Sequence, residues 1–141
     1  MTAPVERFTD NGDGSITDNV SGLMWARQDS WQVDGKWFSW DEAIEYAKHM
    51  NYIRLAGFQD WRLSYVDEVK TLYSPDWENS DKYGTVINLH PIFPEGCLPT
   101  IWLKDDGGGH DGFIFDFRDG ESRELYKSKT GRMAARPVRK G

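Results

Sequence analysis

Two clusters of turn-forming residues near the start of the chain constrain its fold more than any other feature. They are Asn11-Gly12-Asp13-Gly14 and Asn19-Val20-Ser21-Gly22, with Ser15-Ile16-Thr17-Asp18 between them. Asn and Gly adopt positive φ readily, so each cluster is expected to reverse the chain. We therefore predict that residues 7–28 form a small antiparallel meander of very short strands.

Two amphipathic segments follow a polar loop expected at residues 29–38. Ser39 and Glu42 have the spacing of a capping box, and they predict a helix over residues 40–51. Ser64 is expected to cap a second, shorter helix over residues 65–73.

The last third of the chain has the alternation of β-strands. We expect strands over residues 100–104, 112–118, 121–126 and 132–139. Phe113, Phe115 and Phe117 alternate with other residues, which favours a strand with one buried face. Residues 74–99 are expected to be a long irregular surface stretch, and residues 104–112 a flexible glycine-rich loop. This order predicts one domain, residues 1–141, of the α+β class.

Composition excludes two classes of partner. The net charge is −6 and the pI is about 5.0, which argues against general nucleic-acid binding. No apolar run approaches the ~18 residues of a membrane span, so no membrane insertion is expected. Cys97 is the single cysteine and cannot form an internal disulfide. With no signal peptide at the start, we expect a cytoplasmic protein, or an exported one if a leader was removed.

Two acidic segments are candidates for metal binding. Residues 10–14 resemble the start of a calcium loop, but the twelfth position is Ser21 rather than Glu, so turn chemistry explains them better. Asp105, Asp106, His110 and Asp111 lie in the glycine-rich loop and suit either a metal or a solvated loop. We expect no metal and no cofactor.

The binding face is expected on the two loop regions, 74–99 and 104–112, which we place at the same end of the sheet. Its contacts would be Trp77, Trp102, Lys104, Asp105, Asp106, His110 and Asp111. The alternative is a basic strip near the end of the chain, formed by Lys127, Lys129 and Arg132, which would suit an acidic ligand.

Several motifs together resemble the Legionella collagen-like protein C-terminal domain family. Residues 7–25 match its opening pattern, which ends in Thr-Gly-Leu-Met-Trp, almost throughout. Further matches are Trp40 and Ala43, Gly57 with Asp60-Trp61-Arg62-Leu63, and finally Phe117, Gly120, Val138 and Arg139. The sequence departs from the pattern in three places. Ser64 replaces a proline, Pro137 replaces a cysteine, and Trp102-Leu103-Lys104-Asp105 replaces Trp-Ser-Ser-Thr.

The resemblance implies a C-type-lectin-like fold, with two helices packed beside a twisted antiparallel sheet and with long loops. It also implies a bacterial protein of the exported or surface-anchored kind, with adhesion to glycans as a role. Together with the residues, it favours a non-enzymatic binding module for a protein partner. The alternatives are a glycan-binding adhesin domain and an enzyme of unknown reaction on the same scaffold.

Overall fold

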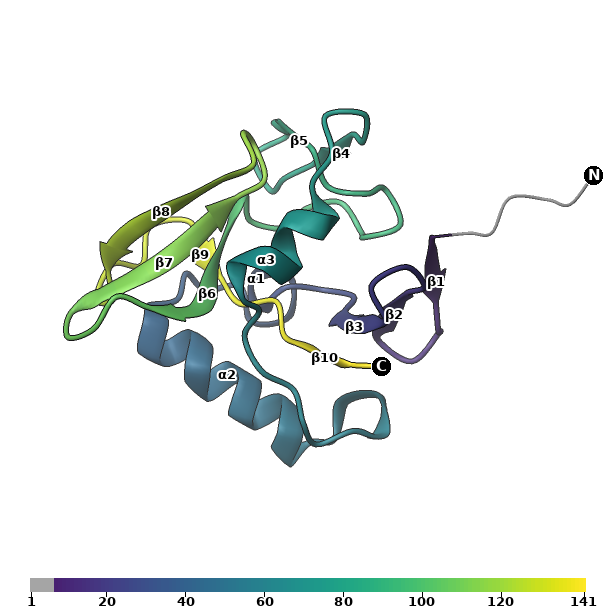
Figure 1. The fold of residues 1–141 in the computed structure, drawn as a ribbon, viewed down its shortest axis with the longest axis horizontal. Helices are drawn as coiled ribbons and strands as arrows, with labels where there is room; N and C mark the ends of the chain where they lie inside the picture. The colour runs from purple at the N-terminus through teal and green to yellow at the C-terminus, as the bar shows by residue number, and fades with distance from the viewer. Residues whose placement is uncertain (1–6) are drawn as a thin grey trace, which may run out of the picture.

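The computed structural model describes residues 7–141, which form two four-stranded sheets, one two-stranded sheet and several helices (Figure 1). The strands are β1 (Phe8–Asp10), β2 (Ser15–Asp18), β3 (Leu23–Ala26), β4 (Asn79–Ser80), β5 (Val86–Ile87), β6 (Thr100–Asp106), β7 (Asp111–Asp116), β8 (Glu121–Tyr126), β9 (Met133–Ala134) and β10 (Val138–Lys140). The helices are α1 (Ser30–Asp34), α2 (Trp40–Tyr52) and α3 (Val66–Val69), with 3-10 turns η1 (Leu55–Gly57) and η2 (Lys70–Leu72). Mixed helices and sheets confirm the α+β class. None of the helices in residues 7–141 is both long and apolar enough to span a bilayer.

The first sheet has the order β1-β2-β3-β10 and confirms the predicted meander. Carboxylates form its first turn, because Asp10 Oδ1 accepts from the Gly12 amide at 3.0 Å and Asp13 Oδ1 from the Ser15 amide at 3.1 Å. The acidic cluster at residues 10–14 is therefore engaged in turn hydrogen bonds. The C-terminal strand β10 pairs antiparallel with β3, so the two ends of the described chain meet in one sheet.

The second sheet has the order β8-β7-β6-β9, and its last strand differs from the prediction. Residues 132–139 do not form one strand. Residues 133 and 134 form β9, which pairs parallel with β6, while β10 joins the first sheet. Pro137 lies between the two strands and has no amide hydrogen to donate to a continuous ladder.

The predicted N-terminal cap is present in α2 but not in α3. Ser39 Oγ accepts from the Glu42 amide at 3.3 Å and Glu42 Oε1 from the Ser39 amide at 2.9 Å, which confirms the capping box of α2. The second predicted helix is shorter, with α3 continuing into η2. Ser64 does not cap it, since its hydroxyl is buried without a hydrogen-bond partner in residues 7–141. Asp105 Oδ1 instead accepts from the Val66 amide at 2.8 Å.

Helix α1 was not predicted, because residues 29–38 were expected to be a loop. Asp29 and Gln32 form a reciprocal capping box at its start, with hydrogen bonds of 2.9 and 3.0 Å. This Asp-x-x-Gln spacing is the sequence signal that identifies the helix.

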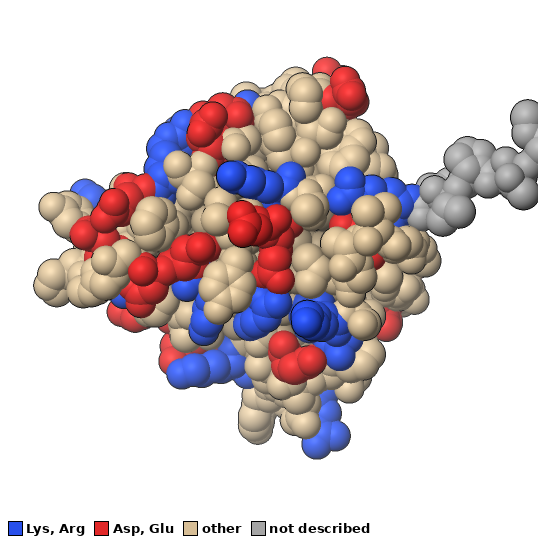
Figure 2. Space-filling model, viewed as in Figure 1, with Lys and Arg blue, Asp and Glu red and all other residues tan. Residues whose placement is uncertain are grey.

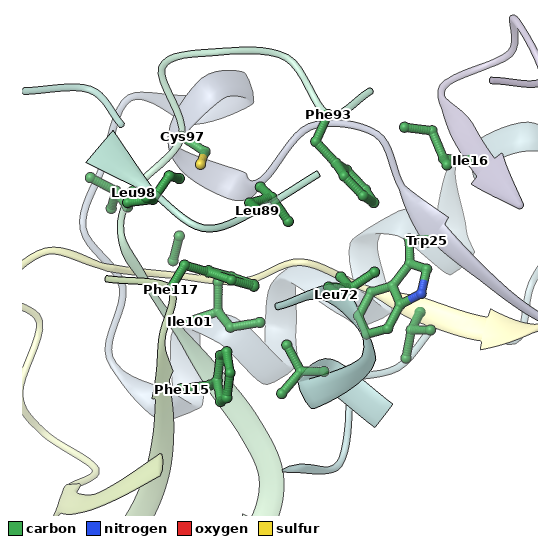
Figure 3. Packing of buried hydrophobic residues seen from close by; sticks show 14 of the residues in the cluster. Ile16, Trp25, Leu72, Leu89, Phe93, Cys97, Leu98, Ile101, Phe115 and Phe117 are labelled. Atoms are coloured by element: carbon green, nitrogen blue, oxygen red, sulfur yellow. The ribbon is translucent and has the colours of Figure 1, made fainter. Parts of the chain in front are cut away.

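Strands β6 and β7 lie between two hydrophobic clusters. On one side Ile101, Phe115 and Phe117 pack with residues of the first sheet and of the 74–99 segment (Figure 3). On the other side Trp102 and Ile114 pack with α2. The expectation that only one face of β7 is buried is therefore wrong.

The 74–99 segment is not a surface stretch. Leu89, Phe93 and Leu98 are fully buried and point into the same cluster as Phe117 (Figure 3). Its prolines interrupt regular structure, but its apolar side chains fill the core all the same.

The turn between β7 and β8 carries a close approach. Gly120 has φ of +73°, and a Cβ placed there would lie 2.7 Å from Cε1 of Tyr73. Tyr73 in turn packs edge-on against Phe115, with ring centroids 6.3 Å apart. Both the left-handed backbone and the ring require glycine at this position.

Candidate functional site: a hollow at the glycine-rich loop

The glycine-rich loop is a tight connection between β6 and β7. The Gly107 amide donates to the Asp111 carbonyl at 3.1 Å, and the Asp111 amide to the Gly108 carbonyl at 3.2 Å. Asp106 Oδ1 accepts from the Gly108 amide at 2.8 Å. The loop thus has a defined shape, with His110 exposed at its end.

Lys127 fastens this loop to the start of α2. Its Nζ lies 2.8 Å from Asp106 Oδ1 and 3.1 Å from the Gly109 carbonyl oxygen. The same ammonium lies 4.3 Å from the ring centroid of Trp40, within cation–π range. The Lys127 backbone repeats the connection, since its amide donates to the His110 carbonyl at 2.8 Å and its carbonyl accepts from the Trp40 amide at 2.9 Å.

Beside these contacts lies an open hollow of about 400 Å³, which we call the loop hollow. Its lining residues are Trp40, Asp41, Gly109, His110, Tyr126, Lys127 and Ser128. Tyr126 is 60% exposed. The loop hollow therefore offers an accessible aromatic ring beside an imidazole, a carboxylate and an ammonium group.

The ion pair with Lys127 sets the electrostatics of the loop. The Lys127 ammonium beside Asp106 holds the pKa of that carboxyl below its ordinary value of 3.8. Asp106 is therefore ionised at neutral pH, and it neutralises the lysine instead of leaving a free positive charge.

The predicted contacts Trp102, Lys104 and Asp105 do not line the loop hollow. Trp102 is 0% exposed, and its Nε1 donates to the buried Phe38 carbonyl at 2.7 Å, so its assignment to a binding face is wrong. Asp105 caps α3, as described above, and this fixes its carboxylate toward that helix. Lys104 is exposed, and its amide donates to the Ser64 carbonyl.

The two loop regions do not lie at the same end of the second sheet, which corrects the expected binding face. The 74–99 segment meets the β7–β8 end, where the Asn88 amide donates to the Phe117 carbonyl at 2.8 Å. The glycine-rich loop lies at the opposite end of the β6–β7 hairpin (Figure 1). Trp77 is half-buried, with its ring 5.9 Å from Phe8 and 5.0 Å from His90 between centroids. It is therefore packed away from the loop hollow.

The basic strip does not form one surface. Lys127 belongs to the loop hollow, and Lys129 is exposed beyond it. Arg132 lies elsewhere, with its guanidinium 4.8 Å from the Tyr83 ring centroid. Acidic and basic side chains are intermixed over the face drawn in Figure 2, without a broad area of one sign.

Asp111 begins β7 and is half-buried. Of the predicted loop contacts, His110 lines the loop hollow, whereas Asp106 and Asp111 flank the same loop without lining the hollow. In residues 7–141 no group of three His, Cys, Asp or Glu side chains has the arrangement of a metal site. Cys97 is buried, and burial raises the pKa of its thiol to about 12.

Sequence reasoning missed Trp40 and Tyr126 as members of this site. Trp40 was assigned to the start of a helix and Tyr126 to the end of a strand. Only the tertiary contacts of Lys127 bring both beside His110.

Comparison with known proteins identifies the family. No curated protein matches the chain. A family model described as the Lcl C-terminal domain matches residues 14–139, which is most of the described chain. The chain therefore belongs to the Lcl C-terminal domain family, that of the Legionella collagen-like protein.

Proposed function

We propose that this chain is a non-enzymatic binding module that recognises a protein partner through the loop hollow. The scaffold would be C-type-lectin-like, with α2 and α3 beside the sheets and with loops presenting the site. The observation that supports this proposal most directly is the Lys127 connection between the glycine-rich loop and α2.

A site fixed in advance loses less conformational entropy when a partner binds. Lys127 contacts the loop through one ion pair, one side-chain hydrogen bond and one backbone hydrogen bond, and its carbonyl accepts a further backbone hydrogen bond from Trp40 of α2. Tyr126 and His110 are therefore exposed side chains on a backbone whose conformation is fixed by these contacts. Exposed tyrosines of this kind are enriched among the residues that dominate protein interfaces.

A glycan is the second candidate ligand. The same hollow places aromatic rings beside hydrogen-bonding groups of Asp41 and His110. Such a combination offers a flat apolar surface to one face of a sugar ring and polar partners to its hydroxyls.

Affinity capture from bacterial lysate with matched variants tests the proposal. We expect Tyr126→Ala and His110→Ala to reduce capture of the partner while leaving the melting temperature nearly unchanged. Tyr52→Ala is the control, because Tyr52 is 83% exposed at the other end of α2, about 18 Å from Trp40 along a helix of this length.

The class of ligand follows from treating the lysate before capture. Loss of the captured species after protease treatment supports a protein partner, whereas loss after glycosidase treatment supports a glycan. If both loop variants capture as much as Tyr52→Ala does, the loop hollow is not the binding site.

A further inference from the structure

A second hollow lies between the meander and α2, and we call it the meander cleft. It has a volume of about 360 Å³ and takes its walls from four parts of the chain. Its lining residues include Gly14, Arg27, Val33, Tyr46, Ile53 and Leu55. This volume falls within the range of ligand pockets in proteins, roughly 300–1,000 Å³.

The walls of the meander cleft are mostly apolar and partly open to water. Val33 from α1 is 52% exposed and Ile53, after α2, is 51% exposed. Leu55 Cδ1 lies 3.2 Å from where a Cβ on Gly14 would be, so the turn of the meander and η1 are in close contact at the rim. Large apolar side chains left exposed around a concavity favour an occupant that would cover them.

Arg27, the basic residue at the mouth of the cleft, does not favour an anionic ligand. Arg27 Nε lies 3.1 Å from Asp10 Oδ2, so its guanidinium already has a counter-charge. An occupant is therefore selected by its apolar body and by hydrogen bonding, not by its net charge.

The lining of the meander cleft also includes a residue that can donate a hydrogen bond, Tyr46. Tyr46 lines the cleft and is only 5% exposed, and its hydroxyl makes no hydrogen bond with any residue in 7–141. In residues 7–141, the side-chain polar atoms that have neither solvent contact nor a hydrogen-bond partner are Trp25 Nε1, Ser64 Oγ and Arg136 Nε. The Tyr46 hydroxyl is not among these atoms. The Tyr46 hydroxyl therefore retains a small exposure, and it belongs to a residue that lines the cleft.

The protonation state of Tyr46 is fixed. Burial, with smaller contributions from the Asp34 and Asp29 charges, raises the pKa of its hydroxyl above the ordinary value of 10.0. The group is consequently a neutral donor at any physiological pH. Because this donor has no hydrogen-bond partner within residues 7–141, an acceptor on a ligand would supply one.

We propose that the meander cleft binds a small, uncharged organic molecule with an apolar body and a carbonyl oxygen, which accepts from the Tyr46 hydroxyl. This site is separate from the loop hollow, because the two share no lining residue. It is therefore independent of the proposed function.

Two probes of equal shape test the proposal on the full chain. Acetophenone has a carbonyl where α-methylstyrene has a C=CH2 group. Titration of each, followed by amide chemical-shift changes in NMR, should show millimolar binding with shifts at Val33, Tyr46 and Ile53. The ketone should bind about fivefold more tightly, which is the effect expected of one neutral hydrogen bond.

Tyr46→Phe removes only the hydroxyl and keeps the ring contact with Phe38, whose centroid is 5.6 Å away. In this variant the two probes should bind equally. Tyr52→Phe makes the same chemical change on an exposed tyrosine and should keep the fivefold preference. The proposal is overturned if neither probe shifts these amides, or if Tyr46→Phe retains the preference for the ketone.

Discussion

Gly120 provides a test in which backbone conformation and side-chain clash are separated. Both Gly120 and Gly12 have left-handed backbones, with φ of +73° and +74°. A Cβ on Gly12 meets nothing within 4 Å, whereas one on Gly120 meets three atoms of the Tyr73 ring at 2.7 to 2.9 Å. Gly12→Ala therefore measures the conformational cost alone, which is about 1–2 kcal/mol.

Gly120→Ala adds the displacement of a half-buried ring that packs on Phe115. Overpacking of this kind costs about 1–3 kcal/mol, so we expect about 3 kcal/mol in total for Gly120→Ala. Urea unfolding followed by the fluorescence of the seven tryptophans measures both values.

Tyr73→Ala completes a double-mutant cycle with Gly120→Ala. Removal of the ring removes the clash, so the double variant should be more stable than the sum of the single changes by about 1–3 kcal/mol. The reasoning is refuted if Gly120→Ala costs no more than Gly12→Ala, or if the changes at Gly120 and Tyr73 are additive within about 0.5 kcal/mol.

Three further predictions follow from contacts described above or at the start of α3. Trp102→Phe leaves the Phe38 carbonyl without its donor and opens a small cavity, so calorimetry should show a loss of about 3 kcal/mol. Arg62 makes two 2.8 Å hydrogen bonds to the carboxylate of Glu68. Burial by itself would raise the pKa of Glu68, but these hydrogen bonds outweigh burial and hold the pKa below its ordinary value of 4.5. The stability advantage of the native protein over Glu68→Gln should thus be complete above pH 4.5 and shrink as pH falls through the lower folded-state pKa, as urea titrations at several pH values would show. Lys127→Met keeps the aliphatic stem but loses the ion pair, so amides of the glycine-rich loop should exchange with deuterium faster than in the native protein, and unchanged rates would contradict its fastening role.

The local parts of the fold could be predicted from the sequence, and the long-range parts could not. The meander turns and the capping box of α2 depend on residues within four positions of each other, so their chemistry is visible in the sequence. The split of residues 132–139 between two sheets depends on which strands they meet. Pro137 indicates where the strand is interrupted, but it does not indicate which strands pair with the two halves.

The candidate site shows the same division. His110 and the glycine-rich loop were found because glycine and acidic residues mark an exposed turn. Trp102 was misplaced because a tryptophan beside such a loop has the same sequence appearance whether it points to solvent or into the core. The role of Lys127 arises from contacts with Trp40, far away in the chain, and no local pattern contains that information.

The first sheet also determines how the chain would respond to a pulling force. Phe8 pairs with Asp18 and Lys140 with Leu23, and these partners flank the same β2–β3 turn. The ends of the two edge strands therefore lie at one end of the sheet, about 14 Å apart across three strand spacings. Tension between residues 8 and 140 acts across the strands, along the hydrogen bonds, so those bonds break one after another rather than together. The second sheet and the loop hollow lie outside this line of force and keep their shape until the first sheet opens.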